Sequence, residues 1–402
     1  MTLEIRAITE AEIPAFREAA MVTFGTDADA DQGGAQQHRE LIAAGRSWAA
    51  FDGLTIVGTA ATLDFQIGVP GGNSLAMAGL TIVTVRPSHR RRGILRELIR
   101  HHLDDAHDRR VPVSGLWASE AAIYQRFGYG LASHAEVYEI ANAHTLPVAA
   151  GRPLDDLEWI DEARGRELLP AIYERATRTR PGALRRSDAW WRERRFSEAP
   201  RHRAGASRLR LVLARRGSEH VGYIVYRQRA KFTDGIPDGR LEITELFGID
   251  ARAEATLWRF ALSVDLFPTV TLWNAPADGS LPWLVPDIRR VKRQRTDNLW
   301  LRIADIPAAL TARSYESDGT LRFAVDDQSW ELSVRDGRGA CTATTQAPEL
   351  RLDRPSLGSL YLGGTSASQL ARADVIQGEP NAITRADRLF MSAIAPWCPE
   401  VF

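Results

Sequence analysis

A chain of 402 residues is too long for one ordinary hydrophobic core and is expected to form two or three domains. Its 44% hydrophobic and 25% charged residues are typical of folded globular proteins and exclude a disordered chain. The formal net charge is zero, so no overall field favours nucleic acid or an anionic membrane surface as a partner.

Signals for export, membrane insertion and metal binding are missing from the sequence pattern. Residues 1–12 lack the basic start and apolar core of a secretory signal, and no apolar run reaches the 18 or so residues of a membrane span. The two cysteines, Cys341 and Cys398, have no metal-ligand spacing around them. We therefore expect a cytoplasmic protein with no membrane span, no metal and no nucleic-acid partner. Two buried thiols are favoured over a disulfide, although pairing stays open.

The first 70 residues alternate strand-like and helix-like patterns. An amphipathic helix with one apolar face is predicted between a first strand and a hairpin whose turn is Asp52-Gly53. The predicted ranges are a strand at 3–9, a helix at 10–24, and paired strands at 47–52 and 56–67.

The next segment predicts a strand, a basic turn containing glycine, a helix and a second strand. The ranges are a strand at 77–85, a helix at 94–106 and a strand at 113–118. A single short helix over 121–127 and a strand over 134–140, which we expect to close this first segment, follow.

The remainder of the chain reads as a linker and two further segments. Residues 147–153 look like a linker, and a second α/β segment with a Trp- and Arg-rich helix at 189–196 runs to about residue 286. Gly248-Ile249-Asp250-Ala251-Arg252 follows its strand where a basic turn would be needed, so this segment is not expected to bind the same ligand. From residue 304 a hairpin at 321–334 and helices near 357–372 predict a small α+β domain.

The basic turn is the most informative stretch of the sequence. Arg90-Arg91-Arg92-Gly93 stands at the start of the predicted helix, where free N–H groups and the helix dipole attract anions. Gly93 permits close approach of the backbone to a phosphate. Arginines at this end oppose the helix dipole, so an anionic ligand explains them better than a solvated helix end. The spacing fits neither a P-loop nor a dinucleotide-binding turn.

The same residues carry a resemblance to a known family. Arg90-Arg91-Arg92-Gly93 is similar to the pyrophosphate loop of the GNAT superfamily of N-acetyltransferases, whose pattern is Gln/Arg-x-x-Gly-x-Gly/Ala, although Leu95 departs from its last small residue. The string Arg-Arg-Arg-Gly-Ile-Leu resembles the loop of the enhanced intracellular survival (Eis) branch. Residues 118–120, residues 123–130 and the terminal Phe402 agree with that branch, as does the chain length.

The resemblance implies a fold and an assembly. An α+β chain is expected, with two GNAT-like α/β domains, the second degenerate, followed by a sterol-carrier-like α+β domain. The implied boundaries are 1–146 for the acetyl-CoA-binding domain, 147–290 for the degenerate domain and 291–402 for the last. The family also implies acetyl-CoA as co-substrate and a homo-oligomer, in particular a hexamer.

The family's chemistry is carried over to matching positions of this chain. The implied acetyl-CoA contacts are Val83, Thr84, Val85, Arg91, Arg92, Gly93, Ile94, Leu95, Arg96, Ser119 and Glu120. The N–H groups of the strand would polarise the thioester carbonyl. Tyr124 would be the general acid and the carboxylate of Phe402 the general base. Without the family, Tyr124 reads as a core aromatic residue, and Tyr129, between two glycines, is expected to shape a turn.

The implied acceptor is a polyamine-type small molecule such as an aminoglycoside, which would make the enzyme an antibiotic-resistance factor. Phe24 could supply an aromatic wall, and Asp27 and Glu400 could supply negative charge. The acidic run around Asp27 could equally be a solvated loop. Protein lysine acetylation is an alternative, and so is a non-enzymatic lipid-binding or interaction protein with a vestigial CoA site.

Overall fold

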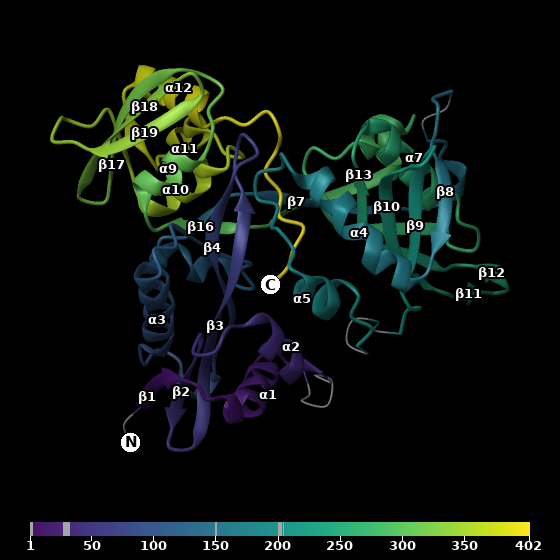
Figure 1. Ribbon diagram of the computed structural model, residues 1–402, viewed down its shortest axis with the longest axis horizontal. Coiled ribbons are helices and arrows are strands. Elements are labelled where there is room, and N and C mark those ends of the chain that lie inside the picture. Colours follow the sequence, from purple (N-terminus) through teal and green to yellow (C-terminus); the bar gives the residue numbers. More distant parts are fainter. Residues whose placement is uncertain (1–2, 27–32, 149–150, 200–202, 204) are drawn as a thin grey trace. The chain divides into compact units, whose positions relative to one another are not determined.

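The computed structural model of the chain describes residues 3–26, 33–148, 151–199, 203 and 205–402. They form two units, both drawn in Figure 1. Unit 1 contains Met1–His134, Thr179–Arg185 and Asp297–Phe402, and unit 2 contains Ala135–Arg178 and Arg186–Thr296. Unit 1 therefore combines both ends of the chain with a short segment from its middle. The domain boundaries implied by the family resemblance stay predictions.

A seven-stranded sheet forms the centre of unit 1, in the order β1-β2-β3-β4-β5-β16-β6. Its strands are β1 (Leu3–Ala7), β2 (Ser47–Asp52), β3 (Thr55–Gly68), β4 (Ser74–Val85), β5 (Val113–Leu116), β16 (Trp300–Ile303) and β6 (Gly130–Leu131). Strands β4 and β5 run parallel, and helix α3 (Ile94–Asp108) connects them. A parallel pair requires such a crossover, and the predicted order of strand, basic turn, helix and strand is confirmed.

The helices of this first part pack their apolar sides on the sheet. The predicted helix at 10–24 is confirmed as a 3₁₀ turn, η1 (Glu10–Glu12), that continues into α1 (Ile13–Thr23). Helix α2 (Gly34–Leu41), which the sequence analysis missed, follows it. Helix α3 buries Ile94, Leu98 and Ile99, spaced as helical periodicity requires, in a core with residues of β2, β3 and β4. This packing fixes the start of α3 beside the end of β4.

The segment after β5 differs from the single helix predicted for residues 121–127. It forms two 3₁₀ turns, η4 (Ala121–Ile123) and η5 (Gln125–Phe127), with Tyr124 between them. Gly128 ends the second turn with a φ of +85°, a conformation that favours glycine. Runs of 3₁₀ helix are short because their hydrogen bonds are poorly aligned. Tyr124 therefore lies at the junction of two tight turns.

Unit 2 contains a second seven-stranded sheet, in the order β15-β7-β14-β13-β10-β9-β8. The strands are β15 (Val291–Asp297), β7 (His134–Ile140), β14 (Thr269–Pro276), β13 (Arg240–Gly248), β10 (Glu219–Arg229), β9 (Arg210–Arg216) and β8 (Asp156–Ile160). The helices are α4 (Glu162–Thr177), α5 (Asp188–Trp190), α7 (Ala251–Ser263) and α8 (Leu281–Leu284), with a π-helical turn at Trp191–Arg195. The predicted Trp- and Arg-rich helix is thus a short α-helix continued by a π turn.

The two sheets exchange one strand. The sixth position of the first sheet, counted from β1, is taken by β16, which pairs antiparallel with both β5 and β6. The equivalent position of the second sheet, counted from β8, is taken by β7, which pairs antiparallel with β14. The expectation that residues 134–140 close the first segment is wrong, because this strand belongs to the second sheet.

The C-terminal part of unit 1 is the small α+β domain that the sequence predicts. Its sheet has the order β19-β18-β17-β20-β21, and the strands are β17 (Gly319–Val325), β18 (Gln328–Arg335), β19 (Arg338–Ala343), β20 (Leu350–Leu352) and β21 (Gln377–Gly378). The helices are α9 (Ile306–Ala312), α10 (Arg354–Tyr361), α11 (Ala367–Arg372) and α12 (Pro380–Phe390). Buried Arg313 donates to the carbonyls of Tyr361 and Phe390, so one guanidinium caps the last residues of α10 and α12. Cys341 and Cys398 are buried free thiols, as favoured.

Candidate functional site

A bulge in β4 shapes the strand end that the sequence analysis singled out. Ala60 of β3 stands opposite both Ile82 and Val83, because the register shifts by one residue there. Ile82 has a φ of +53°, which bends the strand. The buried Thr59 hydroxyl donates to the Ile82 carbonyl at 2.7 Å and lies 2.6 Å from the Thr84 hydroxyl. Two threonines therefore hold the bulge in place.

Strands β4 and β5 separate halfway along β4. Their pairing runs from Met77 with Val113 to Gly79 with Gly115, whereas β4 continues to Val85. On this side, residues 80–85 of β4 have no partner in β5. Those backbone N–H groups that point away from β3 can donate to a ligand that enters the opening, which is the geometry that polarisation of a carbonyl requires.

The basic turn has the backbone of an anion-binding site. Arg91 has a φ of +63° and Gly93 a φ of +81°, so two of its residues are left-handed. Alternation of handedness in a turn directs successive N–H groups into one concavity. Gly93 is the N-cap of α3 and supplies no side-chain hydrogen bond, which leaves the first N–H groups of the helix without an intrahelical acceptor.

The arginines of this turn lack internal counter-ions. Among the residues that the structure describes, Arg90, Arg91 and Arg92 form no ion pair with a carboxylate, and only Arg96 has one, with Glu97 at 3.6 Å. Unneutralised cations at the positive end of a helix dipole repel it. The turn is therefore suited to an anion such as a pyrophosphate.

A pocket of about 830 Å³ lies at this turn and collects most of the predicted site. Ten of the eleven predicted acetyl-CoA contacts line it, all except Arg92, and so do Phe24 and Tyr124. The lining also contains residues that the sequence analysis did not single out as contacts, namely Thr23, Arg90, Ile123, Arg126 and Phe127. Arg126 and Phe127 lie in η5 beside Tyr124, so their proximity in sequence to the predicted acid was an available signal.

Tyr124 reaches the pocket from between the two 3₁₀ turns. The side chain is largely buried, and burial raises the pKa of its hydroxyl to about 12, with a smaller contribution from the charge of Glu120. No hydrogen bond to the hydroxyl is found within the described residues. Tyr124 therefore keeps its proton at ordinary pH and has it available to donate into the pocket.

Tyr129 is engaged in a buried polar chain behind Tyr124. Its hydroxyl lies 2.7 Å from the hydroxyl of Ser114, which contacts His102 Nε2 at 2.7 Å and the Ala78 carbonyl at 3.1 Å. Because the carbonyl only accepts, Ser114 donates to it, and His102 and Tyr129 must donate to Ser114. His102 then accepts from Thr62, 2.6 Å from its Nδ1, and burial lowers the pKa of His102 to about 3. The chain links α3 to the point where β4 and β5 separate.

The C-terminal residue docks on the sheet beside this opening. In Figure 1 the yellow C-terminal segment leaves α12 and descends beside β4. The ring of Phe402 lies 4.8 Å from that of Phe65 in β3, and a Cβ added to Gly79 would come within 3.1 Å of it. Gly79 is the last residue of β4 that pairs with β5. Phe402 thus lies where the two strands part.

The three predicted acceptor-binding residues differ in placement. Phe24 lies at the end of α1, lines the pocket and is 48% exposed, so its ring is available to a ligand. Glu400 is 1% exposed and does not line the pocket. Asp27 lies outside the described residues. Only Phe24 is therefore brought to the pocket beside Tyr124.

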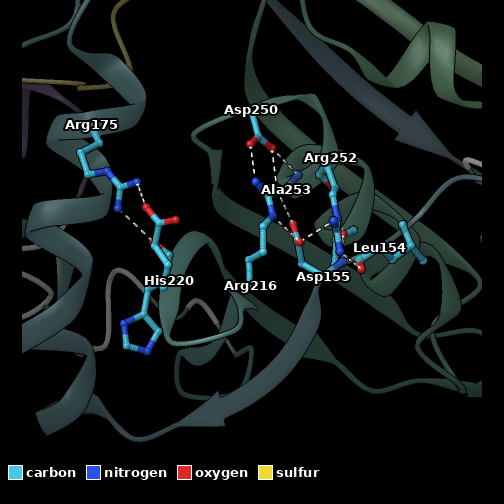
Figure 2. A network of polar contacts seen from close by, with 10 residues as sticks. Leu154, Asp155, Arg175, Arg216, His220, Asp250, Arg252 and Ala253 are labelled. Atoms are coloured by element: carbon cyan, nitrogen blue, oxygen red, sulfur yellow. Dashed lines mark hydrogen bonds and ion pairs between the residues drawn. The ribbon is translucent and has the colours of Figure 1, made fainter.

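The helix of unit 2 that corresponds to α3 starts with a different charge pattern. Figure 2 shows Arg216 between two carboxylates: it is 2.8 Å from Asp155 and 2.9 Å from Asp250, while Arg252 pairs with Asp155 at 2.8 Å. Asp250 is the N-cap of α7 and accepts from the N–H of Ala253 at 2.9 Å. The pKa of Asp250 is lowered, first by its hydrogen bond from Arg216. The start of α7 thus carries its own anion.

None of the described helices is long and apolar enough to cross a membrane. Within the same residues, no group of three or more His, Cys, Asp or Glu side chains is placed to hold a metal ion.

Family models match three segments of the chain. Residues 4–132 and residues 182–303 each match an acetyltransferase (GNAT) domain, and residues 306–399 match a sterol carrier protein domain. These matches confirm the predicted α+β fold class of two GNAT-like domains followed by a sterol-carrier-like domain.

Individual relatives span most or all of the chain. An uncharacterised N-acetyltransferase of Streptomyces avermitilis is 35% identical over the full length of both chains. The N-acetyltransferase Eis of Mycobacterium tuberculosis is 34% identical over 354 residues, or 85% of each chain. The crystal structure of Eis1 from Mycobacterium abscessus covers both chains completely with a TM-score of 0.84 and 30% identity.

Proposed function

Since the chain belongs to the Eis family of GNAT N-acetyltransferases, we propose that it transfers the acetyl group of acetyl-CoA to primary amines of polyamine-type molecules such as aminoglycosides. The transfer is direct, with Tyr124 as general acid and the terminal carboxylate of Phe402 as general base. The observation that carries this proposal is the docking of Phe402 against Phe65 and Gly79, where β4 and β5 open toward the pocket that Tyr124 lines.

The pocket suits the anionic and thioester ends of acetyl-CoA. Arg91, Arg92 and the N–H groups that begin α3 bind the pyrophosphate, since this turn has unneutralised cations and left-handed backbone at Arg91 and Gly93. Of the segment Val83–Val85, the N–H groups that point away from β3 donate to the carbonyl oxygen of the acetyl group. Ser119 and Glu120 also line this pocket. The remaining predicted contacts, Ile94, Leu95 and Arg96, complete the wall at the start of α3.

Tyr124 supplies the proton that the departing sulfur needs. A thiol has a pKa of about 8.5, so a phenol with a pKa near 12 transfers its proton uphill in the resting site. Its burial and, to a smaller extent, the charge of Glu120 raise its pKa and keep it protonated until the thiolate forms. Tyr124 is therefore protonated before the reaction begins. Its proton transfer becomes favourable only as negative charge develops on the departing sulfur.

The base must remove a proton from an amine that is mostly charged. An alkylamine with a pKa of about 10.4 is neutral in roughly one molecule per few thousand at pH 7, which corresponds to about 4.6 kcal/mol. The ring of Phe402 docks at the opening of the sheet, so the terminal α-carboxylate of the same residue is available to act as the base. Phe24 forms an aromatic wall for the acceptor. We keep Asp27 as a proposed source of negative charge for a polycation, whereas the buried Glu400 lies outside the pocket lining and is not assigned this role.

The direct test is release of free thiol from acetyl-CoA in the presence of a multi-amine aminoglycoside, followed by product mass. Thiol release together with mass gains of one or more acetyl groups supports the proposal. Acetylation at several amines would inactivate the aminoglycoside as an antibiotic. Turnover of a lysine peptide in place of the aminoglycoside would instead assign a protein acceptor.

A matched pair of variants tests the terminal base. Addition of two glycines after Phe402 moves the carboxylate away from the ring that anchors it and should abolish turnover. Addition of two glycines before Met1 is the control and should leave turnover unchanged. Acetyl-CoA affinity is expected to stay within a factor of two in both chains. Full turnover by the C-terminally extended chain would refute the role of Phe402.

The family resemblance also supports a hexamer in the cytoplasm. Light scattering coupled to size exclusion measures the mass in solution, and a mass six times that of the 44.6 kDa chain is expected. A monomeric mass would contradict the assembly while leaving the chemistry untouched.

A further inference from the structure

The tail that carries the proposed base is fixed well before its last residue. After α12 ends at Phe390, the chain has no regular structure, yet Trp397, Cys398 and Glu400 are buried. The N–H of Trp397 donates to the Pro181 carbonyl at 2.8 Å, and Arg180 donates to the Ala395 carbonyl at 2.8 Å. The segment Thr179–Arg185 of unit 1 therefore forms one wall of the seat of the tail.

This wall is itself bound to the sheet. The N–H of Gly182 donates to the Gly68 carbonyl at 2.8 Å, and the N–H of Gly68 donates to the Ala183 carbonyl at 2.8 Å. Gly68 is the last residue of β3, the strand that also carries Phe65. The tail is thus attached to β3 at two points. Trp397 binds Pro181, whose segment is bonded to Gly68 of β3, and the ring of Phe402 contacts Phe65 of β3.

Asn298 forms the other wall, and its side chain makes two hydrogen bonds to the backbone of the tail. Its side-chain Nδ2 donates to the Cys398 carbonyl at 3.0 Å, and its Oδ1 accepts from the Cys398 N–H at 2.8 Å. The side chain thereby replaces a strand partner for one residue. Asn298 is fully buried at the connection between β15 and β16.

Ser133 supports the Asn298 amide with a further hydrogen bond. The Ser133 hydroxyl donates to Oδ1 of Asn298 at 2.7 Å and accepts from the N–H of Leu299 at 3.2 Å. The Cys398 N–H can only donate and the Cys398 carbonyl can only accept, so Oδ1 must face the N–H and Nδ2 must face the carbonyl. The amide has one orientation, and the tail has one register against it.

We infer that Asn298 is a positioning residue for the C-terminal carboxylate. The inference rests on the proposed function, because it assigns Asn298 a role only through Phe402. Only a short stretch, Pro399–Val401, separates the gripped Cys398 from Phe402, and within it the Cys398 thiol donates to the Glu400 carbonyl at 3.2 Å. A shift at Cys398 is therefore passed to the carboxylate, and misplacement of a reacting group by about 1 Å costs about 100-fold in rate.

The test compares two Asn-to-Asp substitutions in the otherwise complete chain. Asn298→Asp keeps the size and the two accepted hydrogen bonds but places an acceptor against the Cys398 carbonyl. We expect kcat to fall about 100-fold while KM for acetyl-CoA stays within a factor of two. Asn73→Asp is the control, since Asn73 is an exposed amide that donates to Ala312, and it should leave both constants unchanged.

Two further measurements separate positioning from folding. Ser133→Ala frees the Asn298 amide without adding charge and should lower kcat less, about tenfold, with the circular dichroism spectrum of the parent chain. In a chain that lacks Phe402, Asn298→Asp should cause no further loss of kcat, because the group that it positions is gone. A folded Asn298→Asp or Ser133→Ala chain with parental kcat overturns the inference, as does an additive loss without Phe402. If removal of Phe402 leaves kcat intact, the base assignment itself fails.

Discussion

The starts of helices α3 and α7 occupy corresponding places in two sheets of the same strand order, yet their charges differ: the first is basic, and the second pairs its arginines with carboxylates. At α3, Arg90, Arg91 and Arg92 precede a glycine N-cap and have no carboxylate partner among the described residues. At α7 the N-cap is Asp250, which Arg216 joins to the buried Asp155 (Figure 2). One helix start is suited to a foreign anion, and the other has been filled by the chain's own carboxylates.

The backbone around the two helices has diverged much less than the charges. Strand β13 continues to Gly248 although its pairing with β14 ends at Ile243, and its register against β10 also shifts by one residue. The opening and the bulge of β4 are therefore both present in β13. Beyond the last pairing, Glu245 is buried and forms an ion pair with Arg186 at 2.5 Å. The two sheets thus share a strand arrangement, while the charges at the two helix starts differ.

The largest expected effect comes from Tyr124, the proposed acid in unit 1. Tyr124→Phe removes the proton donor and should lower kcat by about 10² to 10⁴, with acetyl-CoA binding retained. The residues of α8, which follows β14 in unit 2, contain no titratable group. Steady-state kinetics with an aminoglycoside acceptor measure the effect.

Tyr129→Phe is the matched control for this substitution. It removes a buried hydroxyl that bonds to Ser114 and should lower thermal stability while kcat changes less than about threefold. Equal losses of kcat in the two variants would contradict the assignment of Tyr124 as the acid.

A smaller effect, on KM for acetyl-CoA, is expected when the N-cap of α3 is changed to the aspartate found at the N-cap of α7. Gly93→Asp places a carboxylate at the N-cap, as Asp250 does in α7, and should raise KM for acetyl-CoA about 10- to 100-fold beyond the value of Gly93→Asn. Asn and Asp tolerate the φ of +81° similarly, so the pair isolates the charge. Equal KM values in the two variants would show that no anion binds at this turn.

The third prediction concerns the network of unit 2. Asp155→Asn leaves Arg216 and Arg252 with less counter-charge and should lower Tm by about 2 to 6 °C. Turnover should stay within a factor of two, and calorimetry should still count one acetyl-CoA per chain. A second bound acetyl-CoA in this variant would mean that unit 2 retains a cofactor site.

The smallest expected effect is the absence of a change with pH. Because burial raises the pKa of Tyr124 to about 12, the acid stays protonated, and kcat should show no descending limb between pH 7 and pH 10. A raised Tyr pKa also means that any stability this residue contributes is kept below about pH 10 and lost only as pH rises toward 12. A fall of kcat centred near pH 9 would contradict this account.

The local parts of the site could be predicted from the sequence, and the distant ones could not. Arg91, Gly93 to Arg96 and Tyr124, but not Arg92, line one pocket, and the sequence could indicate this because a strand, a basic turn and a helix are contiguous. The seat of Phe402 depends on Asn298 and Pro181, which lie far away in sequence and carry no motif. His102 was missed because its helical pattern reads as an ordinary surface helix, while its partners come from β3 and β5.

The strand exchange escaped prediction for a related reason. Residues 134–140 have the alternation of any half-buried strand, and nothing local indicates which sheet they join. Sequential strands usually pair with one another, so the default assignment was the first sheet. Only the pairing of β16 with β5 and β6 reveals the alternative.

The exchange of β7 and β16 also sets the order in which the protein can mature on the ribosome. The first sheet stays incomplete until Ile303 has emerged, which at about 5 to 20 residues per second means that β5 and β6 wait tens of seconds after they have been made. During this interval the edge of β5 is open to other chains. A gene truncated after the first GNAT-like segment would therefore encode a fragment in which the edge of β5 stays unpaired, and we expect this fragment to lack activity.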